Sequence, residues 1–325
     1  MNNFLVGLLS ALVSTNPPVA VSNFVAQTTG VSVQIPDPND PVEKAYQKLL
    51  EDDDAAQEEV DKWIRDNEAL GEKEAALPDA TLRARVVQRL DVARKAYDEF
   101  LQRHPDHARA RLAYGSFLMD IGEEADAAKE MERARELDPK NPAAWNNLAN
   151  YYGHRSPVEK AFEYYAKAIE LSPDEPIYYQ NLATTVYLFR PAAMEYYRIN
   201  EQQVFDRALE LYRKAMKLDP NNFVLASDYA QSYYGIKPPR TDAAIAAWEE
   251  VLKAASNDVE REGVYIHLAR TKLTAGRLDE ARTHLGNVTN ELYAIMKKRI
   301  SKNLEEKEKK AKETTAPPAS DADNK

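Results

Sequence analysis

The sequence contains no cysteine and only 10 glycines among its 325 residues. Without thiols the chain can form no disulfide, no zinc–thiolate site and no cysteine nucleophile, so packing has to stabilise the fold. The small number of glycines favours long helices over a sheet. Abundant Ala, Glu, Lys, Leu and Arg favour helices as well, because these residues lose little entropy in a helix. The composition therefore predicts an all-α protein.

Basic residues are outnumbered, with 43 Lys and Arg against 53 Asp and Glu and a formal net charge of −10. No stripe of basic and aromatic residues offsets this charge locally, so phosphate backbones would be repelled. Nucleic acid is therefore not an expected partner. The apolar run over residues 4–13 is too short to cross a bilayer, so no integral membrane span is predicted.

The first 22 residues carry features of an export signal. The apolar run over 4–13 is followed by two prolines and by Ala20-Val21-Ser22, a small-x-small pattern suited to signal peptidase. The missing positive charge argues the other way, because Lys44 is the first basic residue. Two hypotheses stay open: a cleaved signal on an exported, periplasmic or secreted protein, or an ordinary apolar leader on a cytoplasmic one.

From about Asp79 onward, similar residues recur at an interval of 34 positions. One column consists of prolines at 105, 139 and 173. Because three separate columns keep the same interval, the sequence predicts a repeating structural unit. The other two columns are Ala93, Ala127 and Ala161, and Phe100, Ala134 and Ala168.

Residues 142–174 show what one unit contains: two amphipathic helical patterns separated by a short turn. The order W-x2-L-A-x2-Y, then A-x3-Y-x2-A, then P resembles the tetratricopeptide repeat signature. Small Ala149 and Ala161 would allow two helices to approach closely. The resemblance implies an α-solenoid of stacked antiparallel helix pairs, a TPR superhelix. Its signature residues are Trp145, Leu148, Ala149, Tyr152, Ala161, Tyr165, Ala168 and Pro173.

The resemblance extends over residues 79–288 as about five repeats, the first of them degenerate. In one unit the second half lies 47 rather than 34 residues after its predecessor, which places an insertion near 190–203. A coiled-coil-like helix over 289–313 is expected to cap the stack through Leu292, Ile295, Met296 and Ile300. The other expected segments are a signal peptide over 1–22, a linker over 23–40, an N-terminal helical segment over 41–78 and a disordered tail over 314–325.

No motif in the sequence points to catalysis or metal binding. The five histidines include no pair at i and i+4, and neither a glycine-rich phosphate loop nor a G-x-S-x-G turn occurs. His104 and His107 are interpreted as part of a solvent-facing turn rather than a metal site. The acidic run over 51–59 lacks the glycine and spacing of a calcium loop and is interpreted as a solvated helix start. No enzyme activity, cofactor or metal is expected.

In tetratricopeptide proteins the first helices of successive repeats line a concave groove. The resemblance implies which residues of this sequence occupy the groove positions. They are neutral, amide-bearing or aromatic, and lack the Lys and Arg with which some relatives clamp chaperone tails. Asn147 and Asn181 are interpreted as structural ties between neighbouring turns. The expected peptide- or protein-binding residues are Asn146, Asn150, Gln180, Thr184, Tyr187, Ser227, Gln231 and Tyr234, with Tyr196 and Tyr197 of the insertion as further contacts or as packing residues.

These observations predict a non-catalytic scaffold or adaptor that binds a protein or peptide of unknown identity in the bacterial cell envelope. Two alternatives stay open. One is an accessory or regulatory subunit of an enzyme complex. The other is a cytoplasmic scaffold, which differs only in whether residues 1–22 are removed.

Overall fold

The computed structural model describes residues 37, 39–71, 77–155 and 157–315. All regular elements in these ranges are helices, and no strand occurs in them, which confirms the predicted all-α class. The chain forms two compact units, Met1–Tyr151 and Tyr152–Lys325. The signal peptide predicted over 1–22, most of the linker predicted over 23–40 and residues 316–325 of the tail predicted over 314–325 lie outside the described residues.

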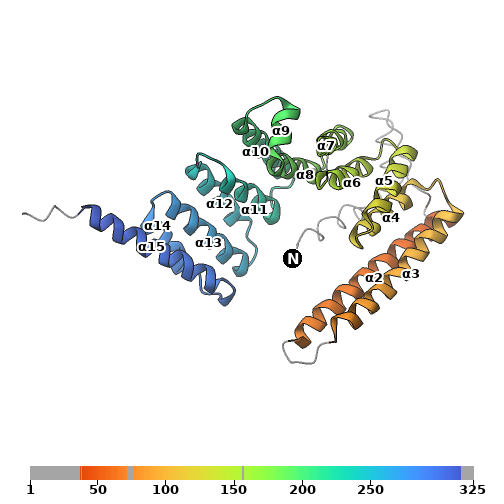
Figure 1. Ribbon diagram of the computed structural model, residues 1–325, viewed down its shortest axis with the longest axis horizontal. Helices are drawn as coiled ribbons and strands as arrows, with labels where there is room; N and C mark the ends of the chain where they lie inside the picture. The colour runs from red at the N-terminus through yellow and green to blue at the C-terminus, as the bar shows by residue number, and fades with distance from the viewer. Residues whose placement is uncertain (1–36, 38, 72–76, 156, 316–325) are drawn as a thin grey trace, which may run out of the picture. The chain divides into compact units, whose positions relative to one another are not determined.

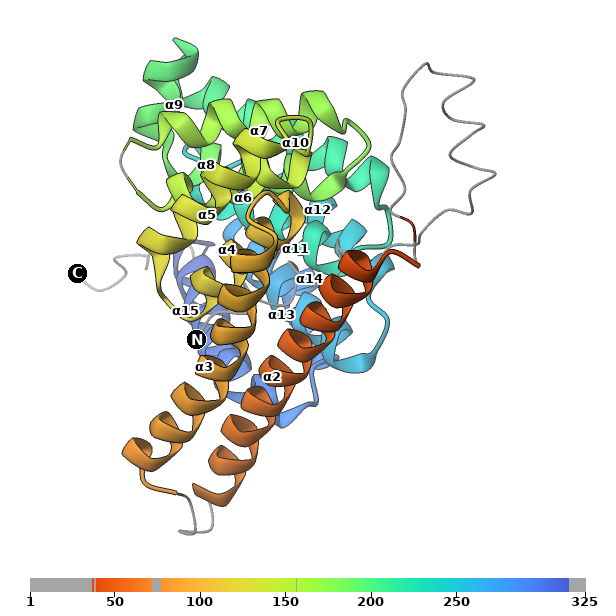
Figure 2. The same ribbon diagram turned by 90° about the vertical axis from the view of Figure 1, so that its right-hand side faces the viewer.

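The first unit begins with two long antiparallel helices, α2 (Pro41–Gly71) and α3 (Asp79–Arg103), which lie side by side (Figures 1 and 2). Three shorter helices follow: α4 (Ala108–Asp120), α5 (Glu124–Leu137) and α6 (Pro142–Gly153). The neighbours α3 and α4 pack together, as do α4 and α5. Helix pairs of this kind are the repeating element of a tetratricopeptide solenoid.

Helix α2 starts where the sequence predicts. The carboxylate of Asp40 accepts a hydrogen bond of 2.8 Å from the amide of Val42, and Pro41 occupies the first helical position, where no amide donor is needed. The helix then continues through the acidic run, so the second helix start expected at 51–59 is wrong. Asp53 is buried rather than solvated, because its carboxylate accepts a 2.6 Å hydrogen bond from the hydroxyl of Tyr97.

The degenerate first repeat also differs from expectation. Residues 79–103 form the single helix α3 rather than a pair, and α2 supplies the partner against which α3 packs. The repeat residues Ala93, Tyr97 and Phe100 lie in the second half of α3 and are buried. The 34-residue column therefore marks the buried side of α3 correctly, although the two-helix interpretation of this segment is wrong.

Two turns between paired helices depend on glycine. Gly122 joins α4 to α5 with φ of 86°, and Gly276 joins α13 (Asp258–Thr274) to α14 (Leu278–Gly286) with φ of 78°, a region that other residues rarely enter. In each turn the amide after the glycine donates to the carbonyl five residues back, from Glu123 to Leu118 and from Arg277 to Lys272. These bonds satisfy carbonyls at the end of the first helix of the pair.

The second unit continues the paired arrangement, with neighbours in chain order packed together from α7 to α8 and from α10 to α15 (Figure 1). The insertion appears as one extra short helix, α9. The elements are α7 (Glu159–Leu171), α8 (Pro176–Leu188), α9 (Arg190–Tyr197), α10 (Glu201–Leu218), α11 (Phe223–Ser232), η2 (Tyr233–Gly235), α12 (Thr241–Ala254), α13 (Asp258–Thr274), α14 (Leu278–Gly286), η3 (Glu291–Tyr293) and α15 (Ala294–Thr315).

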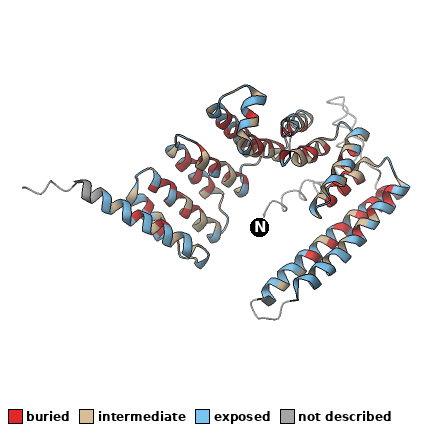
Figure 3. Cartoon of the chain, in the orientation of Figure 1, coloured by how far each residue is buried: buried red, intermediate tan, exposed pale blue. Residues whose placement is uncertain are grey.

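The core follows the repeat columns, and buried residues line the contacts between paired helices (Figure 3). Ala127, Ala161 and Ala168 are buried because only a small side chain fits where helices approach closely. Trp145 differs from its expected place in the core: its ring is half-buried, and its indole N–H donates to the carbonyl of Pro139 at 2.8 Å.

The tyrosines of the insertion pack onto the unit. The rings of Tyr196 and Tyr197 lie 5.4 and 5.5 Å from the ring of Phe162 on α7, and Arg207 lies 3.9 Å from the centre of the Tyr197 ring. Of the two alternatives left open by the sequence, these contacts favour packing. Tyr196 keeps an exposed edge, so its role as a partner contact stays a prediction.

The capping helix α15 packs on α13 and α14 as expected, but of the four residues predicted to make this contact only Ile300 is buried. Ile300 and Leu304 are buried, whereas Leu292 and Ile295 are 67% and 86% exposed. In η3, which precedes α15, the hydroxyl of Tyr293 donates a 2.8 Å hydrogen bond to the carbonyl of Val259 in α13. The prediction that Leu292, Ile295 and Met296 cover the last repeat is wrong.

Candidate functional site

The predicted binding residues of the second unit lie on α8, on α11 and on η2, which directly follows α11, and the first helix of the next pair, α13, repeats their register. Each of α8, α11 and α13 contains an alanine that is fully buried, followed by a residue that points away from the core. The first two such residues are Thr184 and Gln231, and Arg270 occupies the same place on α13. We call the surface formed by Gln180, Thr184, Tyr187, Ser227, Gln231, Tyr234 and Arg270 the α8–α11–α13 face.

Polar side chains link α8 to its neighbours along this face. The amide of Gln180 donates to the carboxylate of Asp228 on α11 at 2.9 Å, and the hydroxyls of Thr184 and Tyr212 lie 2.8 Å apart. Burial raises the pKa of Asp228, and the hydrogen bond from Gln180 opposes that rise. Gln180 and Thr184 are thus held in fixed positions, which lowers the entropy cost of a further contact.

An aromatic group joins α11 to the next repeat. The hydroxyl of Tyr234 lies 2.9 Å from Nδ1 of His267, and the ring of Trp248 is stacked on the His267 ring at 4.1 Å with an interplanar angle of 5°. Burial lowers the pKa of His267 to about 4, and the nearby Arg270 contributes to the lowering. The imidazole is therefore neutral at physiological pH, and the guanidinium of Arg270 lies 4.4 Å from the centre of the Tyr234 ring.

Tyr187 is fixed by close packing. Its hydroxyl occupies the space that a Cβ atom at Gly235 would need, so glycine is required there. The guanidinium of Arg190 lies 5.4 Å from the centre of the Tyr187 ring, and the Phe205 ring lies 6.0 Å from it. The ring is half-buried, so one side of it is available on the face.

The remaining predicted residues divide by exposure. Gln231 is exposed and Ser227 is half-buried, both on α11 between Gln180 and Tyr234. Asn146 and Asn150 belong to the first unit, on α6. Asn146 is only 3% exposed and bonds to the side chain of Asn147, which differs from the open position expected of it.

The proposed structural role of Asn147 agrees with its contact, a 3.1 Å hydrogen bond to the hydroxyl of Ser116 on α4. His104 and His107 are half-buried beside Phe100 rather than solvent-facing, and Nδ1 of His107 accepts the amide of Ala110 at the start of α4. In the described part of the chain, no three His, Asp or Glu side chains are grouped as metal ligands.

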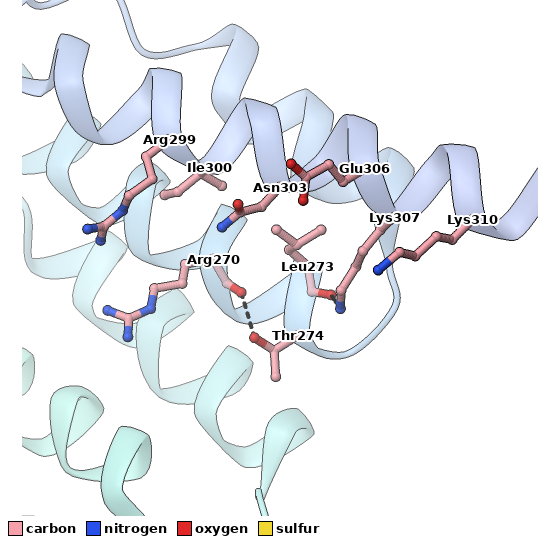
Figure 4. Close-up of a pocket in the computed structure, with 9 residues that line it drawn as sticks. All are labelled: Arg270, Leu273, Thr274, Arg299, Ile300, Asn303, Glu306, Lys307 and Lys310. Atoms are coloured by element: carbon pink, nitrogen blue, oxygen red, sulfur yellow. Dashed lines mark hydrogen bonds between the residues drawn. The ribbon is translucent and has the colours of Figure 1, made fainter.

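Sequence analysis missed Arg270 and a cavity beside it. The cavity has a volume of about 370 Å³ and lies between α13 and α15 (Figure 4). The signal for Arg270 was present, because Ala269-Arg270 repeats the pattern of Ala183-Thr184. The lining residues are Arg270, Leu273, Thr274, Arg299, Ile300, Asn303, Glu306, Lys307 and Lys310.

Comparison with known proteins agrees with the fold. A family model described as tetratricopeptide repeat matches residues 79–142 and 118–176. The C-terminal part of a TPR repeat-containing protein from Cytophaga hutchinsonii is similar over 78% of this chain and 98% of that one, with 15% identity and a TM-score of 0.51. The pilF protein of Pseudomonas aeruginosa is similar over 76% of this chain and 98% of that one, with 16% identity and a TM-score of 0.49. No curated protein matches the sequence.

Among the described residues, every helix is too short or too polar to span a membrane.

Proposed function

We propose that this chain, whose residues 79–142 and 118–176 match the tetratricopeptide repeat family, is a non-catalytic scaffold that binds an extended segment of a partner protein on the α8–α11–α13 face. Gln180 and Thr184 at one end and Tyr234 at the other are held by hydrogen bonds to neighbouring helices. A partner would therefore meet a surface that is already ordered, which reduces the entropy lost on binding.

The observation that carries the proposal is the exposed side chain of Gln231 on α11, one turn before Tyr234. A glutamine amide offers both donors and an acceptor, and so can pair with the N–H and C=O groups of a peptide backbone. The half-buried rings of Tyr187 and Tyr234 supply apolar area at low entropic cost. Recognition of this kind would depend on backbone pairing and shape.

The proposed location is the bacterial cell envelope. It is supported by the apolar run over 4–13 and the small-x-small pattern Ala20-Val21-Ser22. N-terminal sequencing of the protein purified from its natural cells tests this point. A mature chain that begins just after residue 22 supports export, whereas a chain that keeps residues 1–22 favours a cytoplasmic scaffold.

The binding proposal is tested with a tagged full-length chain that captures its partner from the natural cells. Ser227→Ala with Gln231→Ala should weaken the affinity for the captured partner roughly 10- to 30-fold, since two hydrogen bonds contribute about 1 kcal/mol each. The matched control is Glu250→Ala with Lys253→Ala, which removes two exposed side chains of α12. Equal capture by both double variants, with unchanged helicity, would place the binding surface elsewhere.

A further inference from the structure

The cavity between α13 and α15 has an apolar floor and a cationic rim. Leu273 of α13 and Ile300 of α15 are buried at its base. In Figure 4 the guanidinium groups of Arg270 and Arg299, one from each helix, extend in the same direction at one end of the cavity. The cavity therefore places two like charges together, although they repel one another.

The charges around the cavity are unbalanced. Arg270, Arg299, Lys307 and Lys310 line it, against the single carboxylate of Glu306. Within the described residues, neither Arg270 nor Arg299 forms an ion pair with a carboxylate. This local excess of positive charge occurs in a chain whose net charge is −10, so the chain's overall charge does not explain it.

Some of the charged side chains around the cavity already have partners within the protein. Nζ of Lys307 donates a 2.8 Å hydrogen bond to the carbonyl of Leu273 and so stabilises the end of α13. Glu306 has Lys302 at 4.0 Å, a weak contact on the exposed side of α15. The two arginines keep donors that these contacts do not use, and the amide of Asn303 lies beside them in the cavity wall.

Arg270 connects the cavity to the α8–α11–α13 face. Its guanidinium lies 4.4 Å from the centre of the Tyr234 ring, and the residue is also part of the cavity lining. A partner segment lying on the face past Gln231 and Tyr234 would reach the cationic rim with its next residues.

We propose that this cavity binds acidic side chains of the partner segment, an inference that rests on the proposed function. A guanidinium matches a carboxylate with two parallel hydrogen bonds, and two arginines can hold adjacent carboxylates. A carboxylate is favoured as the occupant because Arg270 also contacts Tyr234 of the α8–α11–α13 face, where the proposed partner is a polypeptide segment. The occupant is therefore a polypeptide segment rich in Asp or Glu.

The test uses the full-length chain and fluorescein-labelled hexaglutamate, with fluorescence anisotropy measured at low salt. Arg270→Gln with Arg299→Gln should weaken binding at least about tenfold, because each substitution removes one guanidinium that would pair with a glutamate carboxylate. Arg299→Gln alone should weaken it by about threefold, and it disturbs no contact made by Arg270 with Tyr234. Glu306→Gln should tighten binding by about threefold, an effect that a purely structural role would not produce.

The matched control is Lys217→Gln with Lys298→Gln, which removes the same charge from exposed positions outside the cavity. Unchanged binding by this control supports the site. The inference is overturned if the control loses as much affinity as the arginine variant, if hexaglutamine binds as well as hexaglutamate, or if inorganic phosphate displaces the peptide at equal concentration. It is also overturned if the wild-type chain does not bind hexaglutamate.

These experiments distinguish failure of the proposed function from failure of the acidic-segment inference. If Ser227→Ala with Gln231→Ala loses the natural partner while the arginine variant binds hexaglutamate normally, the proposed function stands and the acidic-segment inference falls. If hexaglutamate binding depends on Arg270 and Arg299 while the partner is still captured by the Ser227 and Gln231 variant, the cavity is a binding site and the proposed face is wrong.

Discussion

The hydroxyl of Tyr234 lies 2.9 Å from Nδ1 of His267, and this pair joins one repeat of the second unit to the next. Tyr234 belongs to η2 and His267 to α13. His267 is also stacked on the buried Trp248. Burial and the charge of Arg270 both lower the pKa of His267, so the imidazole at this contact between repeats is held neutral.

Acidic pH should lower the unfolding free energy of the chain through protonation of His267. Burial lowers the pKa of His267 to about 4, compared with 6.5 for an unfolded histidine, so below pH 6.5 the unfolded state binds more protons. Between pH 7 and pH 5 this group should cost about 2 kcal/mol of unfolding free energy. Urea unfolding of the wild-type chain and of His267→Gln should show that extra loss only in the wild type. Parallel pH profiles for the two proteins would contradict the assignment.

A methyl group at residue 235 should displace Tyr187. Since the Tyr187 hydroxyl occupies the space of a Cβ at Gly235, Gly235→Ala should destabilise the chain by about 1–3 kcal/mol in urea unfolding. Tyr187→Phe in the same chain should restore part of the loss, because the closest atom is then absent. Gly286→Ala is the control, since a Cβ atom added there would have no neighbour within 4 Å, and a similar loss would point to a general glycine effect.

The two faces of α15 should differ in their contribution to stability. Leu304→Ala removes a side chain that is 4% exposed and should cost about 2–4 kcal/mol. Ile295→Ala removes one that is 86% exposed and should change the unfolding free energy by less than about 0.5 kcal/mol. Chemical denaturation of both variants measures the difference, and the reverse order would restore the register expected from the sequence.

Loss of the Tyr97 hydroxyl should leave a buried carboxylate short of a donor. Burial raises the pKa of Asp53, and hydrogen bonds from Tyr97 and Gln57 oppose that rise. Tyr97→Phe should therefore cost about 1–3 kcal/mol at pH 8, and the cost should shrink as the pH falls through the raised pKa of Asp53, because protonation removes the charge that the hydroxyl stabilises. Tyr46→Phe is a matched control, because the Tyr46 hydroxyl makes only a long 3.4 Å bond to a carbonyl. An equal loss across this pH range would exclude the charge as the cause.

The sequence by itself determined the repeating helix pairs. The columns of Ala127 with Ala161 and of Ala134 with Ala168 recur every 34 residues and are buried, because small side chains are needed wherever helices approach closely. Local chemistry likewise set the start of α2, where Asp40 and Pro41 suit the free amides of a first turn. Such features depend on residues close together in the chain or on a recurring pattern.

Only the tertiary structure decided which side of each helix is covered and which side chains meet. Leu292 and Ile295 fit a helical apolar pattern as well as Ile300 and Leu304 do, yet only the second pair is buried, because α15 packs on α13 and α14 through that side. Arg270 and Arg299 belong to no shared sequence pattern, and they line one cavity only because α15 packs back on α13. Helical periodicity gives each helix an apolar side, but the neighbours that cover it come from packing between residues distant in the chain.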